Sequence, residues 1–374
     1  MVGKKEIIMA KVFFMNMRAS FGENSFAKFN KLLKKLKLNE LVTKNALIAI
    51  KLHFGEMGNL AFISPIWVRE LVKYIKELGG NPFLTDTSTL YAGSRVNAVN
   101  HLQTAFANGF NYACVQAPII IGDGLKGEAG VEVIINKKHF KSITTSQIVR
   151  EADLIVSLAH FKGHTLTGFG GSLKNIGMGL ADRKGKFKMH SDVVPIIARK
   201  MCDQCLMCVN NCQVSAISIV HKMPEIDTDK CLGCGQCIVM CPNKVFSIDW
   251  ESVLPAIVQE RMVEFAYGGL LDKKACFFNF IIDVTPDCDC YSHSDTNIIP
   301  DVGILGSLDP VAIDQASIDL VNQQIGIPNT ALKTNFQPGE DKLQGIAPKL
   351  TAEPQLNYAQ EIGLGMRKYE LEEV

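Results

Sequence analysis

The chain of 374 residues lacks several features that would direct a protein to particular partners or compartments. It has no apolar run near the roughly 18 residues that a membrane helix needs, and its opening segment, MVGKKEIIM, has no apolar stretch of signal-peptide length. Its charges nearly cancel, with 39 Lys and Arg against 38 Asp and Glu. We therefore expect a cytoplasmic protein that neither spans a membrane nor binds nucleic acid.

Cysteine, in contrast, is plentiful, and eight of the twelve cysteines fall into two runs of identical spacing. Three cysteines at every third position and a fourth after three intervening residues form the bacterial ferredoxin pattern, in which the fourth cysteine of each run ligates the other run's [4Fe-4S] cluster. One cluster would take Cys202, Cys205, Cys208 and Cys241, and the other Cys231, Cys234, Cys237 and Cys212. The spacing predicts an electron-transfer protein with two [4Fe-4S] clusters.

The two runs also form an internal repeat. CDQCLMCVNNCQVSAISI aligns without a gap with CLGCGQCIVMCPNKVFSI at an offset of 29 residues, and each half is predicted to end in a short strand, at 216–219 and 245–248. Structural zinc is an alternative, but it would leave the third cysteine of each triplet without a role. Disulfides persist mainly in oxidising compartments, which the cytoplasmic expectation excludes.

Outside these runs, short β-branched segments alternate with helical patterns, which is typical of an α/β fold with a mostly parallel sheet. Strands are predicted at 46–51, 82–84, 119–121, 154–158, 277–282 and 302–305, and helices at 65–78, 96–108, 253–267 and 310–321. Predicted strands lie both before and after the cysteine runs. We therefore expect a discontinuous α/β host domain, residues 1–197 and 250–374, with an inserted α+β ferredoxin-like domain at 198–249.

Polar residues that follow the predicted strands are candidates for a site, because ligands of open parallel sheets bind beyond the carboxyl ends of the strands. These residues are His53, Glu56, Asp86, Asp123, His160, His164, Cys288, Cys290 and Asp309. Histidine, carboxylate and thiolate thus collect where a site is expected.

The segment SLAHFKGHTLTGFGGSLKN is the richest of these strand ends. His160, Lys162 and His164 precede a glycine run, and Lys174 follows it. Exposed amides of a flexible backbone beside cations suit a phosphate or a small carboxylate substrate, whereas the dinucleotide fingerprint G-x-G-x-x-G is absent. The alternative is a glycine-rich connection with solvated lysines. In KLHFGEMGN, His53 beside Glu56 could bind metal, act as a base or form a surface hydrogen bond.

The segment TPDCDC places Cys288 and Cys290 one residue apart. On an extended backbone both thiols would point the same way, so both could reach one additional metal ion, or one could act as a thiol in the site. Buried, inert cysteines are the alternative. Cys114 and Cys276 lie in apolar surroundings, and we assign both to packing.

These motifs carry a family resemblance over nearly the whole chain. KLHFGE, SLAHFKGHTLTGFGGSLKN, KMHSDVVP, TPDCDC and GSLDPVAIDQAS resemble the iron-sulfur family called domain of unknown function 362. The resemblance implies an α/β host domain with a two-cluster ferredoxin module, and it implies no settled reaction. The host is also similar to nickel-pincer lactate racemases in its strand-end histidines and lysines, without a shared motif, which is an analogy of fold alone.

Three functions compete. The preferred one is an iron-sulfur oxidoreductase that relays electrons between a redox partner protein and the host site, where Lys162 and Lys174 hold a small anionic substrate and His53, His160 or His164 binds metal or transfers protons. The second is a ferredoxin-type carrier that docks a protein partner, with the basic face of Lys31, Lys34, Lys35 and Lys37 as a possible dock. The third is a metal-dependent non-redox enzyme with structural or sensing clusters.

Overall fold

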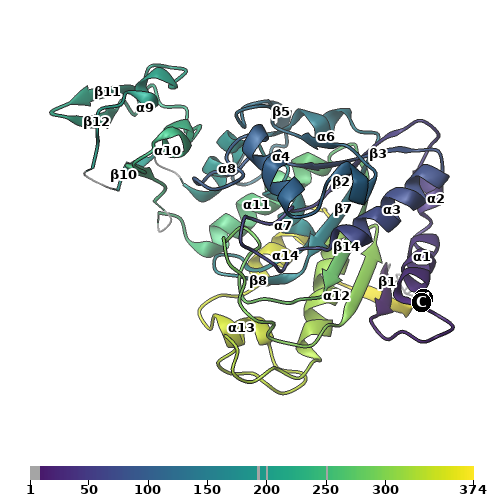
Figure 1. Cartoon of the computed structure of the whole chain (residues 1–374). Helices are drawn as coiled ribbons and strands as arrows, with labels where there is room; N and C mark the ends of the chain where they lie inside the picture. The colour runs from purple at the N-terminus through teal and green to yellow at the C-terminus, as the bar shows by residue number, and fades with distance from the viewer. Residues whose placement is uncertain (1–8, 192–193, 199–200, 250–251) are drawn as a thin grey trace, which may run out of the picture.

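The structure, a computed structural model, describes residues 9–191, 194–198, 201–249 and 252–374. An eight-stranded sheet crosses its main body in the strand order β16-β1-β15-β14-β7-β2-β3-β4 (Figure 1). The strands are β1 (Ala10–Asn16), β2 (Leu47–Lys51), β3 (Asn81–Asp86), β4 (Ile119–Ile121), β7 (Leu154–His160), β14 (Lys274–Ile281), β15 (Gly303–Ser307) and β16 (Tyr369–Glu373). Neighbouring strands pair in parallel, except that β15 is antiparallel to both β1 and β14. The expected α/β fold with a mostly parallel sheet is confirmed.

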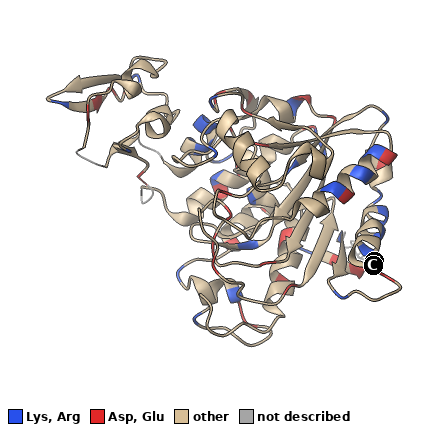
Figure 2. Cartoon of the chain, in the orientation of Figure 1, with Lys and Arg blue, Asp and Glu red and all other residues tan. Residues whose placement is uncertain are grey.

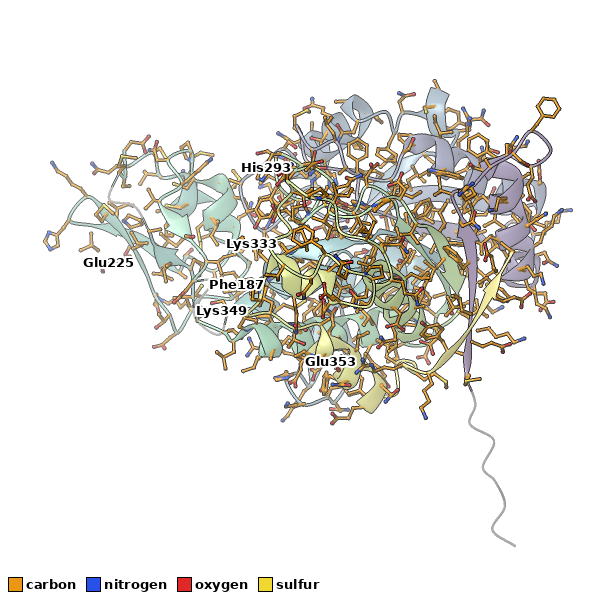
Figure 3. All side chains as sticks on the ribbon, turned by 90° about the horizontal axis from the view of Figure 1, so that it is seen from below. Phe187, Glu225, His293, Lys333, Lys349 and Glu353 are labelled. Atoms are coloured by element: carbon orange, nitrogen blue, oxygen red, sulfur yellow. The ribbon has the colours of Figure 1, made fainter. Side chains whose placement is uncertain are left out.

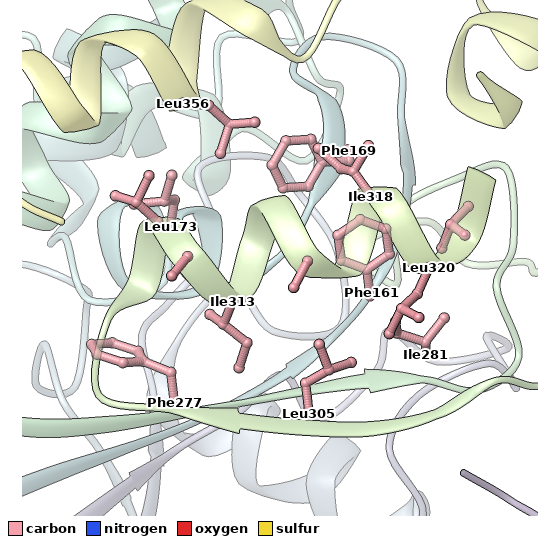
Figure 4. Packing of buried hydrophobic residues seen from close by; sticks show 14 of the residues in the cluster. Phe161, Phe169, Leu173, Phe277, Ile281, Leu305, Ile313, Ile318, Leu320 and Leu356 are labelled. Atoms are coloured by element: carbon pink, nitrogen blue, oxygen red, sulfur yellow. The ribbon is translucent and has the colours of Figure 1, made fainter. Parts of the chain in front are cut away.

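Helices pack on both faces of this sheet, each over its own apolar core. One face carries α7 (Ser172–Gly177), α11 (Pro255–Leu270), α12 (Pro310–Asn322) and α14 (Glu353–Glu361), and the other carries α1 (Ser25–Lys35), α3 (Pro65–Glu77) and α4 (Ala98–Ala107). Side chains alternate along β14, so Phe277 enters the first core and Phe278 the second. Figure 4 shows α12 packed over Phe277 and Leu305. Burial on both faces explains why these strands are continuous apolar runs.

The reversed direction of β15 corrects one expectation about the site. β15 runs opposite to its neighbours β1 and β14, which run in the same direction as the other strands. The carboxyl end of β15 therefore lies at the opposite edge of the sheet from the carboxyl ends of the other strands. Asp309, which follows β15, therefore does not join the other strand-end residues. Its carboxylate caps α12 by accepting hydrogen bonds from the amides of Val311 and Ala312, at 2.8 and 2.9 Å.

Residues 194–198 and 201–249 form a lobe that projects from the main body (Figure 1). Its elements are β10 (Ile196–Ile197), α9 (Met207–Asn210), β11 (Ile217–Val220), β12 (Met223–Ile226), α10 (Gln236–Met240) and β13 (Phe246–Ser247). β10 pairs with β13 and β11 pairs with β12, both antiparallel. The strand that opens this unit thus lies two residues before the expected boundary at 198.

The remaining elements are α2 (Leu38–Leu41), α5 (Tyr112–Val115), β5 (Gly130–Ile134), β6 (Ser142–Ser146), α6 (Gln147–Glu151), β8 (Lys162–His164), β9 (Gly168–Gly170), α8 (Arg183–His190) and α13 (Lys342–Ile346). β8 and β9 form a short hairpin directly after β7. Of the helices that the structure describes, none combines the length and the apolar character needed to cross a bilayer.

Candidate functional site

A cavity of about 590 Å³ lies beyond the carboxyl ends of β2, β3 and β7. Eight residues selected from the sequence line it: His53, Asp86, His160, Lys162, His164, Lys174, Cys288 and Cys290. The fold therefore brings together side chains from four segments that are far apart in the chain. Their chemical roles remain predictions.

Cys288 lies beside a cation and a second thiol in the cavity. Nζ of Lys174 donates to Sγ of Cys288 at 3.2 Å, and the amide of Cys290 donates to the same sulfur at 3.4 Å. The Cys290 thiol, Lys174 and His164 together lower the pKa of Cys288 well below its ordinary value despite its burial, whereas the hydrogen bond to Cys288 raises the pKa of Cys290. Cys288 is thus a thiolate that faces the thiol of Cys290.

Two of the lining histidines use Nδ1 as an acceptor. Nδ1 of His164 accepts from the amides of Leu166 and Thr167, both at 3.1 Å, and Nδ1 of His53 accepts from the amide of Gly55 at 3.0 Å. Burial lowers the pKa of His164 and brings that of His53 to about 3, so both rings are neutral with their proton on Nε2. Both are hydrogen-bond donors, which does not suit the predicted roles of metal ligand or base.

His160 belongs to a buried ion-pair network. Its Nδ1 donates to Asp289 at 2.7 Å, and its Nε2 donates to the carbonyl oxygens of Ile282 and Asp283. Lys162 donates to the other oxygen of Asp289 at 3.0 Å. Both ring nitrogens of His160 thus face oxygen atoms of the protein, and these contacts position Asp289. The predicted role of His160 in metal binding or proton transfer stays a prediction.

A second network, around Asp86, includes cations that the sequence reasoning did not select. Lys51 contacts Asp86 at 3.0 Å, and Arg95 lies 3.6 Å from the other oxygen of Asp86 while donating to Glu56 at 3.1 Å. Arg95 and Tyr91, whose hydroxyl donates to the carbonyl oxygen of Cys290 at 2.9 Å, line the cavity. No strand-end rule points to residues that far beyond β3.

Lys186 and His190 of α8 also line the cavity without having been selected. Burial lowers the pKa of Lys186 to about 8 and that of His190 to about 4. Nδ1 of His190 donates to the carbonyl oxygen of Lys186 at 2.8 Å, so the neutral ring carries its lone pair on Nε2. Asp123, which was selected, accepts hydrogen bonds from Ser88 and does not line the cavity.

The amides directly after the glycine run bind a carboxylate of the protein itself. The amides of Ser172 and Leu173, at the start of α7, donate to the carboxylate of Asp314 at 2.7 and 2.9 Å. A Cβ at Gly171 would lie 2.4 Å from that carboxylate, which explains the glycine there. At Gly170, a Cβ would lie 3.3 Å from the side chains of both Lys162 and Lys174. The run therefore makes room for the two lysines.

The two cysteine runs share one backbone conformation. Left-handed residues recur at an offset of 29 positions: Gln204 and Gly233, Leu206 and Gly235, and Ser215 and Lys244. In each run the fourth cysteine accepts a hydrogen bond at its sulfur from the amide four residues on, at 3.2 Å for Cys212 and 3.3 Å for Cys241. The sequence repeat is therefore a structural repeat.

Thiols of one run affect the ionisation of thiols in the other run. Burial raises the pKa of Cys208, and the neighbouring thiols of Cys241 and Cys202 raise it further. Burial also raises the pKa of Cys234, with Cys212 and Cys231 among the contributing neighbours. The fourth cysteine of each run is thus among the thiols that affect a member of the other run's triplet.

One of these groups lies against the main body, beside the cavity. Leu90, which lines the cavity, packs in one apolar cluster with Cys237, Ile238 and Phe187. A Cβ at Gly235 would lie 2.8 Å from Leu90. Figure 3 shows Phe187 at the side of the main body that faces the lobe, with Glu225 farther out on the lobe. The same hydrophobic cluster thus joins the lobe's thiols to the cavity wall.

Comparison with known protein families assigns the chain. The model of the family described as Domain of unknown function (DUF362) matches residues 48–319. The chain belongs to this family. The match covers the strands β2 to β15 and all the cavity-lining residues named above.

Similarity to individual proteins is more limited. The chain is 36% identical over 47 residues to a protein of the ion-translocating oxidoreductase complex of Methanosarcina acetivorans, which is 13% of this chain and only 18% of that protein. Among solved structures, it resembles the lactate racemase apoprotein of Thermoanaerobacterium thermosaccharolyticum, with a TM-score of 0.39, 15% identity, and coverage of 74% of this chain and 51% of the other. A Thermotoga maritima protein gives a TM-score of 0.41 and 10% identity, with coverage of 78% and 57%.

Across residues 9–191, 194–198, 201–249 and 252–374, no three His, Cys, Asp or Glu side chains converge closely enough to hold one metal ion.

Proposed function

We propose that the protein is an iron-sulfur oxidoreductase in which two [4Fe-4S] clusters in the lobe exchange electrons with a small anionic substrate in the cavity. In this proposal the lobe is a ferredoxin-like insert in a discontinuous α/β host domain. A redox partner protein supplies or removes the electrons at the lobe. When bound, the clusters supply electrons one at a time.

The cysteines of the lobe fit two cubanes. Cys202, Cys205, Cys208 and Cys241 would hold one, and Cys231, Cys234, Cys237 and Cys212 the other. The influence of Cys241 on the pKa of Cys208 and of Cys212 on that of Cys234 supports this crossed assignment. The amide hydrogen bonds to the sulfurs of Cys212 and Cys241 support it as well, because such bonds are one means of setting a cluster's potential.

The observation that carries the proposal is the position of Leu90. Its side chain is 4% exposed, lines the cavity and packs with the cysteines of the lobe. Arg183 fixes this contact, because its guanidinium donates to the carbonyl oxygen of Thr89 and to the side-chain amide oxygen of Gln236, in the lobe. A carrier that served only a docked partner would have no need of a cavity beside its cysteine loops.

The charges of the cavity favour an anion. Lys51, Lys162 and Arg95 are balanced by buried carboxylates. Among the described residues, Lys174 and Lys186 form no ion pair with a carboxylate, and Lys174 faces the sulfur of Cys288, so Lys186 carries the unbalanced positive charge while that sulfur is a thiolate. We assign Lys174 and Lys186 to substrate binding and the N–H groups of His53 and His164 to hydrogen bonding.

The docking face of the alternative carrier function receives less support. Lys31 pairs with Glu23, Lys35 with Glu372 and Lys37 with Glu40. Figure 2 shows acidic residues among these lysines on and around α1. A face that is already neutralised in this way is a solvated surface more than a dock for an acidic partner.

The test begins with anaerobic purification, metal and sulfide analysis, and EPR, where two cubanes require about eight iron per chain. The photoreduced protein is then mixed with a panel of small carboxylates and organic phosphates, and cluster re-oxidation is followed by absorbance. We expect either the carboxylates or the phosphates to re-oxidise the clusters. Lys174→Met should abolish this re-oxidation without changing the iron content. Lys349→Met, at an exposed lysine, should behave as the wild type.

Three outcomes would contradict the proposal. An iron content well below eight per chain would refute the presence of two clusters. If no member of the panel re-oxidises the clusters and a partner protein copurifies, the carrier function is favoured. A non-redox conversion of one panel member at equal rates with oxidised and reduced clusters would favour the metal-dependent enzyme.

A further inference from the structure

Cys288 and Cys290 share a tight turn, which differs from the extended segment expected for them. The amide of Tyr291 donates to the carbonyl oxygen of Cys288 at 3.0 Å and closes the turn. Both side chains line the cavity, and the Cys290 amide donates to the sulfur of Cys288 at 3.4 Å. The turn therefore folds the second cysteine back onto the first.

The turn is held in place from three sides. The amide of Glu56 donates to the carbonyl oxygen of Asp289 at 3.0 Å, and Tyr91 donates to that of Cys290 at 2.9 Å. A Cβ at Gly58 would lie 2.6 Å from the carbonyl oxygen of Ser292, so this glycine lets the two loops approach. Because Tyr91 follows Leu90, the loop that touches the lobe's cysteine cluster also contacts the turn.

The two thiols have different charge environments, which suits thiol-disulfide chemistry. The Cys290 thiol, Lys174 and His164 lower the pKa of Cys288, whereas the hydrogen bond to Cys288 raises the pKa of Cys290. A pair of inert packing cysteines would look like Cys276, which is wholly buried in the core and whose pKa burial alone raises. The cysteine pair instead has a charged, cavity-facing environment that suits a reactive thiolate.

We propose that Cys288 and Cys290 form a reversible dithiol–disulfide couple, a two-electron store within the cavity. Oxidation joins the two sulfurs, releases the Cys290 proton and gives up two electrons; reduction takes up two electrons and one proton and restores the thiolate and the thiol. The source of these two electrons, one from each of two reduced clusters, rests on the proposed function. The couple itself requires only a dithiol reductant and its disulfide.

The test is an equilibrium redox titration of the full chain in mixtures of reduced and oxidised dithiothreitol, under argon. Samples are quenched in acid, alkylated under denaturing conditions and digested with trypsin. The tryptic peptide 275–333 contains Cys276, Cys288 and Cys290 and no other cysteine, so Cys276 serves as an internal reference. We expect three labels at reducing potentials and one, on Cys276, at oxidising potentials, with a single two-electron transition.

Lys174→Met gives a sharper readout. A cation within about 4 Å of a thiolate favours the ionised form by roughly tenfold or more, and stabilising the thiolate stabilises the reduced state. Removing this cation should therefore favour the disulfide by at least about tenfold, which corresponds to about 30 mV toward more negative potential. Lys349→Met should leave the transition unchanged.

Three labels at every potential, or a transition that persists in Cys288→Ser, would overturn the inference. Cys237→Ala, which removes a predicted cluster ligand, separates this inference from the proposed function. If protein without clusters, variant or wild type, still shows the normal transition, the dithiol–disulfide couple stands and the clusters are not its electron source. If the protein holds eight iron per chain and shows no transition, the clusters stand and the couple is refuted.

Discussion

Asp289 offers the most direct test of how the cavity is built. Its carboxylate is 1% exposed and is shared by His160, at 2.7 Å, and Lys162, at 3.0 Å. Asp289→Asn preserves the shape of the side chain and removes the charge, which leaves the buried ammonium of Lys162 and the ring of His160 without the carboxylate that they share. Removing one partner of a buried ion pair costs about 3–5 kcal/mol. We expect a loss of this size in the free energy of unfolding at pH 7.

The assay is urea unfolding followed by far-ultraviolet circular dichroism, with Asp287→Asn as the matched control in the same loop. Asp287 is half-buried and lies outside the ion-pair network. Burial opposes ionisation of Asp289, but His160 and Lys162 outweigh it and lower its pKa. The stabilisation is therefore complete above the ordinary carboxyl pKa of about 3.9 and is lost as the pH falls further. A difference below about 1 kcal/mol at pH 7 would refute the reasoning.

Three further predictions concern other parts of the site. Burial lowers the pKa of Lys186 to about 8, so the affinity for an anion should be highest well below pH 8 and should fall as the pH rises through 8. Titration calorimetry of Lys186→Met should show no fall in affinity over this pH range. Gly171→Ala would place a Cβ 2.4 Å from the carboxylate of Asp314 and should lower the free energy of unfolding in urea by about 1–3 kcal/mol. Gly22→Ala, whose Cβ would have nothing within 4 Å, should leave this free energy unchanged. Arg183→Met removes hydrogen bonds to both the main body and the lobe, so hydrogen exchange across 231–241 should rise severalfold while the sheet remains protected.

The sequence predicted what depends on local pattern. Continuous apolar runs marked β2, β3, β4, β7, β14 and β15, and cysteine spacing marked the repeated loops, because both signals are contained in a few neighbouring residues. The direction of β15 was missed, since pairing with both β1 and β14 depends on strands that are distant in the chain. Asp309 was therefore placed at the wrong edge of the sheet.

The charged partners within the cavity were missed for the same reason. Asp289 is separated by more than a hundred residues from the histidine and the lysine that it holds, and Lys186 enters the cavity from a helix that no strand-end rule selects. The protonation of the histidines also depends on partners, because the amides that donate to His53 and His164 fix which nitrogen carries the proton. Residue type alone predicts a polar site, but not which histidine keeps a lone pair.

The cavity's positive charge follows from an uneven distribution of buried counter-charges. Asp86 and Asp289 each neutralise cations at the sheet edge, where a lone buried lysine would lose its proton or destabilise the fold. Lys174 instead faces the sulfur of Cys288, so its charge is balanced only while that sulfur is a thiolate. Oxidation of Cys288 to a disulfide would release this cation to bind an anion. The redox state of the cysteine pair and the affinity for an anionic substrate should therefore be linked, and each should shift the other by the same factor.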